Sequence, residues 1–226
     1  MSDTAKVPQR VAVGTQHLRL MGYLPAVVIF ACVLAILLII PAAAYVGRDY
    51  GFFTRDPTQL GKIPRYAGYL SSLGVMAWTA GASISFFSSA VLFLLSADLF
   101  RAKFFLFFGS FTALLAGDDL FLIHENFFFG EKAVFLGYGL IALTGLVLFR
   151  SVFNNSAAGF AKLAVAAFLL SLMIDAAQRL MNGPMGDFRI LTEDGAKFFG
   201  VVCWAIFLCK FGASSILEAF HERSVR

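Results

Sequence analysis

The stretch that decides the fold is Lys103–Lys132, which reads KFFLFFGSFTALLAGDDLFLIHENFFFGEK. It begins as an apolar helix and then places Asp118, Asp119, His124 and Glu125 in a run whose phenylalanine, leucine and isoleucine residues continue past the two aspartates. Ionisable groups inside the hydrocarbon layer of a membrane are costly, and where they occur they usually serve a function. The stretch therefore predicts a membrane-spanning helix that carries a polar site.

Helical geometry arranges these side chains in lines along the helix. At about 100° per residue, Asp118 and Glu125 lie nearly on one line, and Asp119 lies beside it. His124 points about 100° away from Glu125, so it joins the acidic stripe only if the helix loosens near Glu125 or a neighbouring helix supplies partners. The alternative is that His124 and Glu125 simply end the helix at the membrane interface, which explains the two deeper aspartates poorly.

The composition indicates a membrane protein. Hydrophobic residues make up 59% of the 226-residue chain and charged residues only 14%, whereas soluble domains carry about 25% charged residues. A soluble fold could not bury so much apolar surface. The net charge of +4 is small and dispersed, which argues against nucleic acid and leaves membrane lipid as the expected partner.

Six apolar runs are long enough to cross a bilayer. We therefore predict an all-α, polytopic integral membrane protein with six transmembrane helices in one bundle. The predicted spans cover residues 23–46, 69–95, 104–127, 132–149, 160–180 and 193–211. A flexible or surface-lying arm, residues 1–22, precedes them, and a polar tail, residues 212–226, follows them. Ala42–Ala44 would also suit a signal-peptide cleavage site, but the apolar run before it is long for one, which favours a retained span.

The start of the sixth span contains polar residues that have a purely local explanation. Thr192 resembles an N-cap, and acidic residues in the first turn complement the helix dipole. Glu193 and Lys197 have the spacing of an ion pair within one helix, as do Asp175 and Arg179 in the fifth span.

Six spans place both termini on one side of the membrane. Ten of the 18 basic residues then lie on the terminal side, which predicts cytoplasmic termini in an inner membrane. Ten of the 14 acidic residues lie on the opposite side. They are Asp49, Asp56, Asp118, Asp119, Glu125, Glu131, Asp175, Asp187, Glu193 and Asp194. A cation-binding or proton-handling site would account for this asymmetry.

The predicted site gathers side chains from the third, fifth and sixth spans at the non-cytoplasmic face. The predicted metal ligands are Asp118, Asp119, Asp175 and Glu193, and the predicted catalytic groups are His124, Glu125 and Lys197. Carboxylates with one imidazole suit a hard or borderline divalent metal ion, whose identity the sequence leaves open. We expect Asp118 to face the bundle interior and contact polar groups of the fifth or sixth span. The alternative is a set of unrelated interfacial caps and ion pairs.

Three classes of function fit this site. The first is a metal-dependent membrane enzyme, such as a hydrolase, that acts on a lipid or another apolar substrate. The second is a cation- or proton-coupled carrier or channel. The third is a non-catalytic subunit or sensor of a membrane complex, in which the Phe-rich helix surfaces contact partner subunits or a second copy of the chain. The sequence contains no HExxH, P-loop or GxSxG motif to choose among them.

Overall fold

The computed structural model describes residues 9–55, 57–64, 66–126, 128, 130–177 and 186–224. All regular structure within these residues is helical, which confirms the all-α fold class. The chain divides into two compact units, Met1–Ala67 and Gly68–Arg226.

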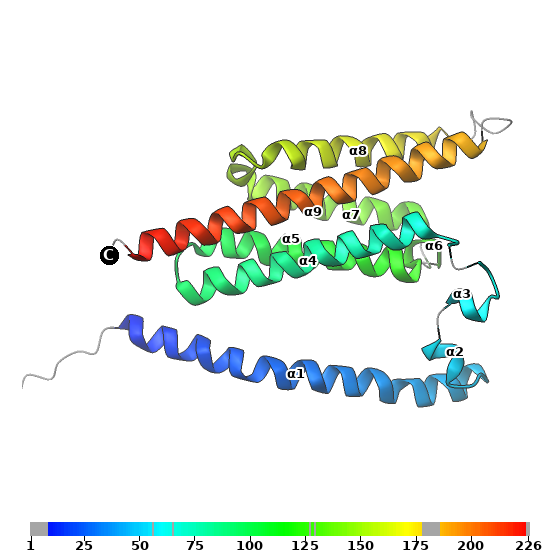
Figure 1. Cartoon of the computed structure of the whole chain (residues 1–226), viewed down its shortest axis with the longest axis horizontal. Helices are drawn as coiled ribbons and strands as arrows, with labels where there is room; N and C mark the ends of the chain where they lie inside the picture. The colour runs from blue at the N-terminus through cyan, green and yellow to red at the C-terminus, as the bar shows by residue number, and fades with distance from the viewer. Residues whose placement is uncertain are drawn as a thin grey trace, which may run out of the picture. The chain divides into compact units, whose positions relative to one another are not determined.

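The first unit is built on one long helix (Figure 1). It contains α1 (Gln9–Val46), α2 (Gly51–Thr54) and α3 (Pro57–Leu60). The helix begins well before the predicted first span, so residues 9–22 of the predicted arm are helical. Residues 10–21 contain no proline and a single glycine, so nothing in this segment ends a helix.

The second unit contains the remaining helices. They are α4 (Tyr69–Leu95), α5 (Leu99–Phe121), α6 (Ile123–Asn126), α7 (Glu131–Leu148), the 3₁₀ helix η1 (Arg150–Asn154), α8 (Ala158–Ala176) and α9 (Gly186–Ser224). Among the residues that the structure describes, four helical segments are long and apolar enough to cross a membrane: Tyr69–Leu95, Leu99–Phe121, Ala158–Ala176 and Phe188–Ser224. Two further apolar segments, Cys32–Val46 and Lys132–Leu148, are shorter.

The third predicted span, residues 104–127, differs from the observed helix at both ends. Helix α5 already begins at Leu99, because the Asp98 side chain caps it by accepting the Arg101 backbone N–H at 2.9 Å. It ends at Phe121, where Leu122 adopts a left-handed conformation with φ of 51°. Helix α8 ends at Ala176, and residues 178–180 of the fifth predicted span lie outside the described residues.

The sixth predicted span, residues 193–211, is too short at both ends. Thr192 is not an N-cap, because its hydroxyl donates to the Phe188 carbonyl at 2.7 Å inside the helix. Residues 212–224 of the predicted tail continue α9 as a helix. Ser215 is buried there, and Glu218 forms an ion pair with Arg101 of α5. At about 1.5 Å per residue, α9 is roughly 58 Å long.

The helices of the second unit run lengthwise in one bundle (Figure 1). Helix α4 packs against both α5 and α9, and α8 packs along α9. The first turns of α4, α7 and α9 therefore lie at the same end of the bundle as the last turns of α5 and α8. This arrangement brings the ionisable residues of several helices to one end.

Small side chains on α4 allow its two neighbours to approach closely. A Cβ atom on Gly81 would lie 3.4 Å from the Leu208 side chain of α9. On the same face, the Ser85 hydroxyl donates to the Gly81 carbonyl at 2.9 Å, and the Ser89 hydroxyl donates to the Ala102 carbonyl of α5 at 2.9 Å. These buried hydroxyls are satisfied by backbone carbonyls, so the close contact leaves no polar group of theirs unpaired.

Aromatic rings fill the centre of the bundle. Phe104 of α5 contacts several other rings, and Phe211 of α9 stacks on Phe105 at a centroid distance of 5.1 Å. The Trp204 indole N–H donates to the Thr112 hydroxyl at 3.0 Å, so its polar atom is also satisfied. This core separates the acidic end of the bundle from the end that holds Arg101.

The α8–α9 contact depends on a glycine. A Cβ atom on Gly200 would lie 2.8 Å from the Phe168 ring, whereas a Cβ atom on Gly195 of the same helix meets nothing within 4 Å. We expect Gly200→Ala to lower the free energy of unfolding by about 1–3 kcal/mol through overpacking. Gly195→Ala is the matched control, and its higher helix propensity should make it neutral or stabilising. Equal thermal melting of the two variants would contradict this packing.

Candidate functional site

A break after α5 turns His124 back onto Asp118. Leu122 has a left-handed backbone, and the chain re-enters a helix at Ile123. Asp118 Oδ1 accepts the His124 backbone N–H at 2.8 Å, and Asp118 Oδ2 lies 2.7 Å from His124 Nδ1. A leucine in this conformation costs roughly 1–2 kcal/mol, and the two bonds to Asp118 offset that cost. The helix thus loosens just before Glu125, as the sequence required for His124 to join the acids.

The Asp118–His124 pair is shielded from solvent. The exposed fraction of the side chain is 5% for Asp118 and 12% for His124. Helix α7 covers the pair, since the Phe135 ring centroid lies 5.3 Å from that of His124 and Tyr138 is close enough to Asp118 to interact with it electrostatically. Which of the two His124 ring nitrogens carries a proton depends on the imidazole tautomer. The 2.7 Å contact therefore joins two groups that can each bind a proton.

Asp119 faces different neighbours, because it lies one residue further round the helix. Its Oδ2 accepts the Trp78 indole N–H of α4 at 2.9 Å. Its Oδ1 pairs with the Lys197 ammonium group of α9 at 2.6 Å. The Asp119 side chain is 13% exposed and the Lys197 side chain 45% exposed. Asp119 thus connects α5 to both α4 and α9.

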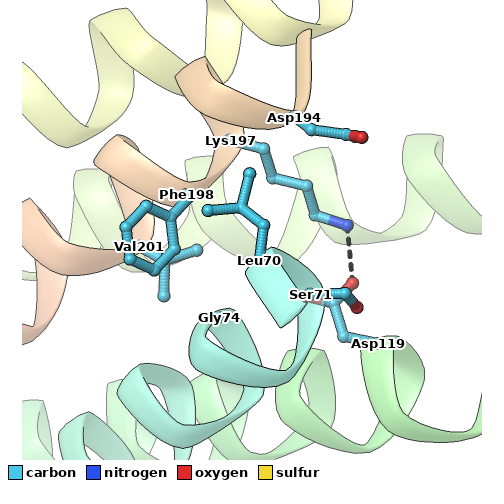
Figure 2. A pocket seen from close by; sticks show the side chains of 8 residues that line it. All are labelled: Leu70, Ser71, Gly74, Asp119, Asp194, Lys197, Phe198 and Val201. Atoms are coloured by element: carbon cyan, nitrogen blue, oxygen red, sulfur yellow. Dashed lines mark hydrogen bonds and ion pairs between the residues drawn. The ribbon is translucent and has the colours of Figure 1, made fainter. Parts of the chain in front are cut away.

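The Asp119–Lys197 ion pair lies in the wall of a pocket (Figure 2). The pocket has a volume of about 100 Å³ and is lined by Leu70, Ser71, Gly74, Asp119, Asp194, Lys197, Phe198 and Val201. Figure 2 shows Lys197 reaching from α9 to the carboxylate of Asp119 on α5. Ser71 and Asp194 are exposed, so the pocket opens at the acidic end of the bundle.

Glu193 belongs to a third group of charges. It forms an ion pair with Arg189 one turn earlier on α9, and not with Lys197 as its spacing predicted. Asp175 of α8 and Asp194 also act on Glu193 electrostatically. Arg189 is 8% exposed, and its Nε has no hydrogen-bond partner among the residues that the structure describes.

The structure brings the predicted residues together at one end of the bundle but divides them into separate pairs. Asp118 is buried, as expected, yet within the described part of the chain its hydrogen-bond partner is His124, and not a polar group of α8 or α9. The side chain of Glu125 lies outside the described part of the chain, as does Arg179. No group of three or more His, Cys, Asp or Glu residues placed to hold a metal ion occurs among the described residues.

Sequence reasoning missed three residues that complete these pairs: Trp78, Tyr138 and Arg189. Trp78 and Tyr138 lie inside apolar runs, where an aromatic residue usually contributes packing alone. Their polar atoms meet Asp119 and Asp118 only because α4 and α7 pack beside the end of α5. The one signal that could have suggested such a contact is an indole or phenol in one predicted membrane helix and an acidic residue in another.

The uncharged segments of the helices can be compared in length with the hydrocarbon core of a bilayer. Residues 104–117 of α5 carry no charge over about 21 Å, and residues 163–174 of α8 and 198–209 of α9 carry none over about 18 Å each. A bilayer has a hydrocarbon core about 30 Å thick. Lysines at the far ends can extend their long side chains outward, but aspartates cannot. If these helices span a membrane, Asp118 and Asp119 thus lie within or at the edge of the hydrocarbon, where they need the partners described above.

The fold and the site define a class: a helical bundle with helices of membrane-spanning length and paired ionisable side chains at one end. The chain belongs to the family described as "Domain of unknown function (DUF8692)", whose model matches residues 26–211. The match includes every residue of the two pairs and of the pocket. No curated protein and no solved structure matches the chain.

The contact between Asp119 and Lys197 should appear in a double-mutant cycle. We expect Asp119→Asn and Lys197→Met each to lower the free energy of unfolding, and the double variant to lose about 1 kcal/mol less than the sum of the two. Chemical denaturation in detergent measures all four free energies. Strict additivity would show that the two side chains do not interact in solution.

Proposed function

We propose that this protein is a six-span integral membrane protein that exchanges protons at the Asp118–His124 pair, as part of a cation- or proton-coupled carrier or channel. The observation that carries the proposal is the pairing of a carboxylate whose side chain is 5% exposed with one imidazole at 2.7 Å. A carboxylate and an imidazole in contact can pass a proton between them, and the burial of the pair makes its proton state matter to the surrounding helices.

The arrangement of ligands favours proton exchange over divalent-metal binding. A divalent metal needs several oxygen or nitrogen ligands around one point, and the described residues offer pairs. Both oxygens of Asp119 are already engaged by an indole N–H and an ammonium group. The metal-dependent lipid enzyme that the sequence suggested first is therefore less favoured by this geometry than the carrier or channel.

The groups that face the pair decide how its proton state changes. Tyr138 of α7 interacts with both Asp118 and Asp119. Asp119 is the nearest carboxylate along the chain, and its own charge is balanced by Lys197. Among the residues whose side chains are described, Asp118 is the carboxylate paired with His124. A proton bound to His124 would therefore strengthen the contact between α5 and α6.

The proposed topology includes α1 and α7 as spans and places both termini in the cytoplasm. The support is the apolar character of Cys32–Val46 and Lys132–Leu148, although both segments are shorter than the other four. A short α7 can still span if its flanking lysine and arginine side chains extend toward the headgroups.

Cysteine labelling tests this topology. In a variant whose three native cysteines are replaced by serine, we expect Lys132→Cys to react with a membrane-impermeant thiol reagent from the periplasmic side of intact cells. Ser96→Cys and Ser151→Cys should react only after the membrane is opened, because an odd number of spans separates them from Lys132. Labelling of all three positions from the same side would contradict a bundle in which α5 and α7 both cross the membrane.

Proton flux tests the role of the pair. We expect purified protein in liposomes with a trapped pH-sensitive dye to dissipate an imposed pH gradient. Asp118→Asn and His124→Gln should reduce this flux by a factor of roughly 100, since each removes a group that binds the transferred proton. Glu222→Gln is the matched control, because Glu222 is an exposed acid near the far end of α9.

The outcomes separate a proton-exchanging carrier or channel from a structural subunit. Flux in the wild type that survives Asp118→Asn would show that another group carries the proton. A second outcome would be no flux in the wild type and a melting temperature that stays constant between pH 5 and 8. This outcome would contradict a proton-exchanging site and favour a structural subunit.

A further inference from the structure

We propose that the pocket beside Asp119 binds a small monovalent cation of the ammonium type, and that the Lys197 side chain takes this cation's place in the present structure. This proposal rests on the proposed function, in which the acidic end of the bundle handles cations. The ammonium-type cation would bind next to the proton-exchanging pair.

The charge of the pocket favours a cation. Its lining contains two carboxylates, Asp119 and Asp194, and one ammonium group, Lys197. The Ser71 hydroxyl adds a further oxygen ligand at the opening. Excess negative charge around a small volume attracts a cation and repels phosphate or another carboxylate.

Asp119 is the fixed part of the site. Its carboxylate is held from α4 by the indole N–H of Trp78, which is 4% exposed. The Trp78 ring in turn stacks on Phe168 at a centroid distance of 5.6 Å and an interplanar angle of 11°. The carboxylate therefore keeps its position whether or not a cation is bound to its other oxygen.

Lys197 is the movable part of the site. Its ammonium group makes a charge-assisted bond of 2.6 Å to Asp119 Oδ1. The side chain is nevertheless 45% exposed, and a four-carbon stem with this exposure can turn toward water at little cost. A primary ammonium group is thus already seated on the fixed carboxylate, and a free cation of the same chemistry would compete with it.

The size of the pocket limits the ligand. A volume of about 100 Å³ corresponds to roughly three water molecules at 30 Å³ each. Ammonium, methylammonium and the alkali ions fit this space. A quaternary ammonium such as tetramethylammonium has no N–H group and cannot make the short bond that Lys197 makes.

Chemical rescue tests the proposal. We expect Lys197→Ala in detergent micelles to melt at a lower temperature than the wild type, because Asp119 loses its counter-charge. Methylammonium chloride should raise that melting temperature by roughly 3 °C above the value in tetramethylammonium chloride at the same ionic strength. The difference should vanish in Lys197→Ala/Asp119→Asn.

Lys210→Ala is the matched control for the lysine. Lys210 lies on the same helix and is exposed, but its ammonium group lies over the Phe160 ring, 5.1 Å from the ring centroid. Its melting temperature should be the same in the two salts. Potassium chloride is a third condition for Lys197→Ala. If potassium raises the melting temperature as much as methylammonium does, the site also binds alkali ions. If only methylammonium raises it, the site binds primary ammonium ions. Equal melting of Lys197→Ala in all three salts would overturn the proposal.

A second measurement uses the wild type and does not depend on the stability of a variant. Displacement of Lys197 by methylammonium should change the fluorescence of Trp78, and the change should be absent in Trp78→Phe, which retains Trp204. No change in the wild type up to molar methylammonium would also overturn the proposal. Asp118 and His124 are intact in all these proteins. Failed rescue with intact Asp118-dependent flux would therefore reject the cation pocket alone, and rescue without flux would reject the proton-exchange function alone.

Discussion

Two adjacent carboxylates at the end of α5 depend on separate partners, and much of the local structure serves to supply them. A carboxylate in hydrocarbon without a partner costs at least about 2.5 kcal/mol, and two neighbouring charges also repel each other. The helix places Asp118 and Asp119 about 100° apart, so no single cation can neutralise both. Asp118 receives His124 through the break at Leu122, and Asp119 receives Lys197 from α9.

These contacts also hold three helices together at this end of the bundle. Lys197 and Trp78 join α9 and α4 to Asp119, so three helices meet at one carboxylate. The small residues of α4 let the same three helices approach along their length. A similar connection exists at the opposite end, where Arg101 of α5 pairs with both Asp98 and Glu218. Ion pairs at the two ends thus fix how α5 and α9 are placed along each other, and the aromatic core between them supplies the buried apolar surface.

The division of the ionisable residues into pairs has a consequence for function. A metal centre needs convergent ligands, whereas proton exchange needs a titratable group whose charge state changes the energy of its surroundings. Under the proposed function, the Asp118–His124 pair is such a titratable group. The other pair, Asp119 and Lys197, adjoins a small pocket with excess negative charge. A proton site and a cation site one residue apart on the same helix would influence each other through their charges, which is what coupling between the two requires.

The sequence by itself determined the fold class and the end of the bundle at which the ionisable residues lie. Both follow from local properties: apolar runs of spanning length and the alternation of chain direction between them. The second and fourth predicted spans agree closely with α4 and α7, because charged or glycine-containing turns bound them on both sides. The ends of the sixth span could not be predicted, since the burial of Ser215 and the ion pair of Glu218 that accompany the added turns depend on contacts with other helices.

Only the tertiary structure decided which ionisable residues meet. Sequence spacing paired Glu193 with Lys197, yet Glu193 turns to Arg189 and Lys197 turns to Asp119. The reason is physical: a lysine stem on α9 can reach either its own helix or the neighbouring α5, and the less exposed carboxylate gains more from a counter-charge. In the same way, Trp78 became a donor to Asp119 because α4 lies beside α5, which no pattern within a single helix can encode.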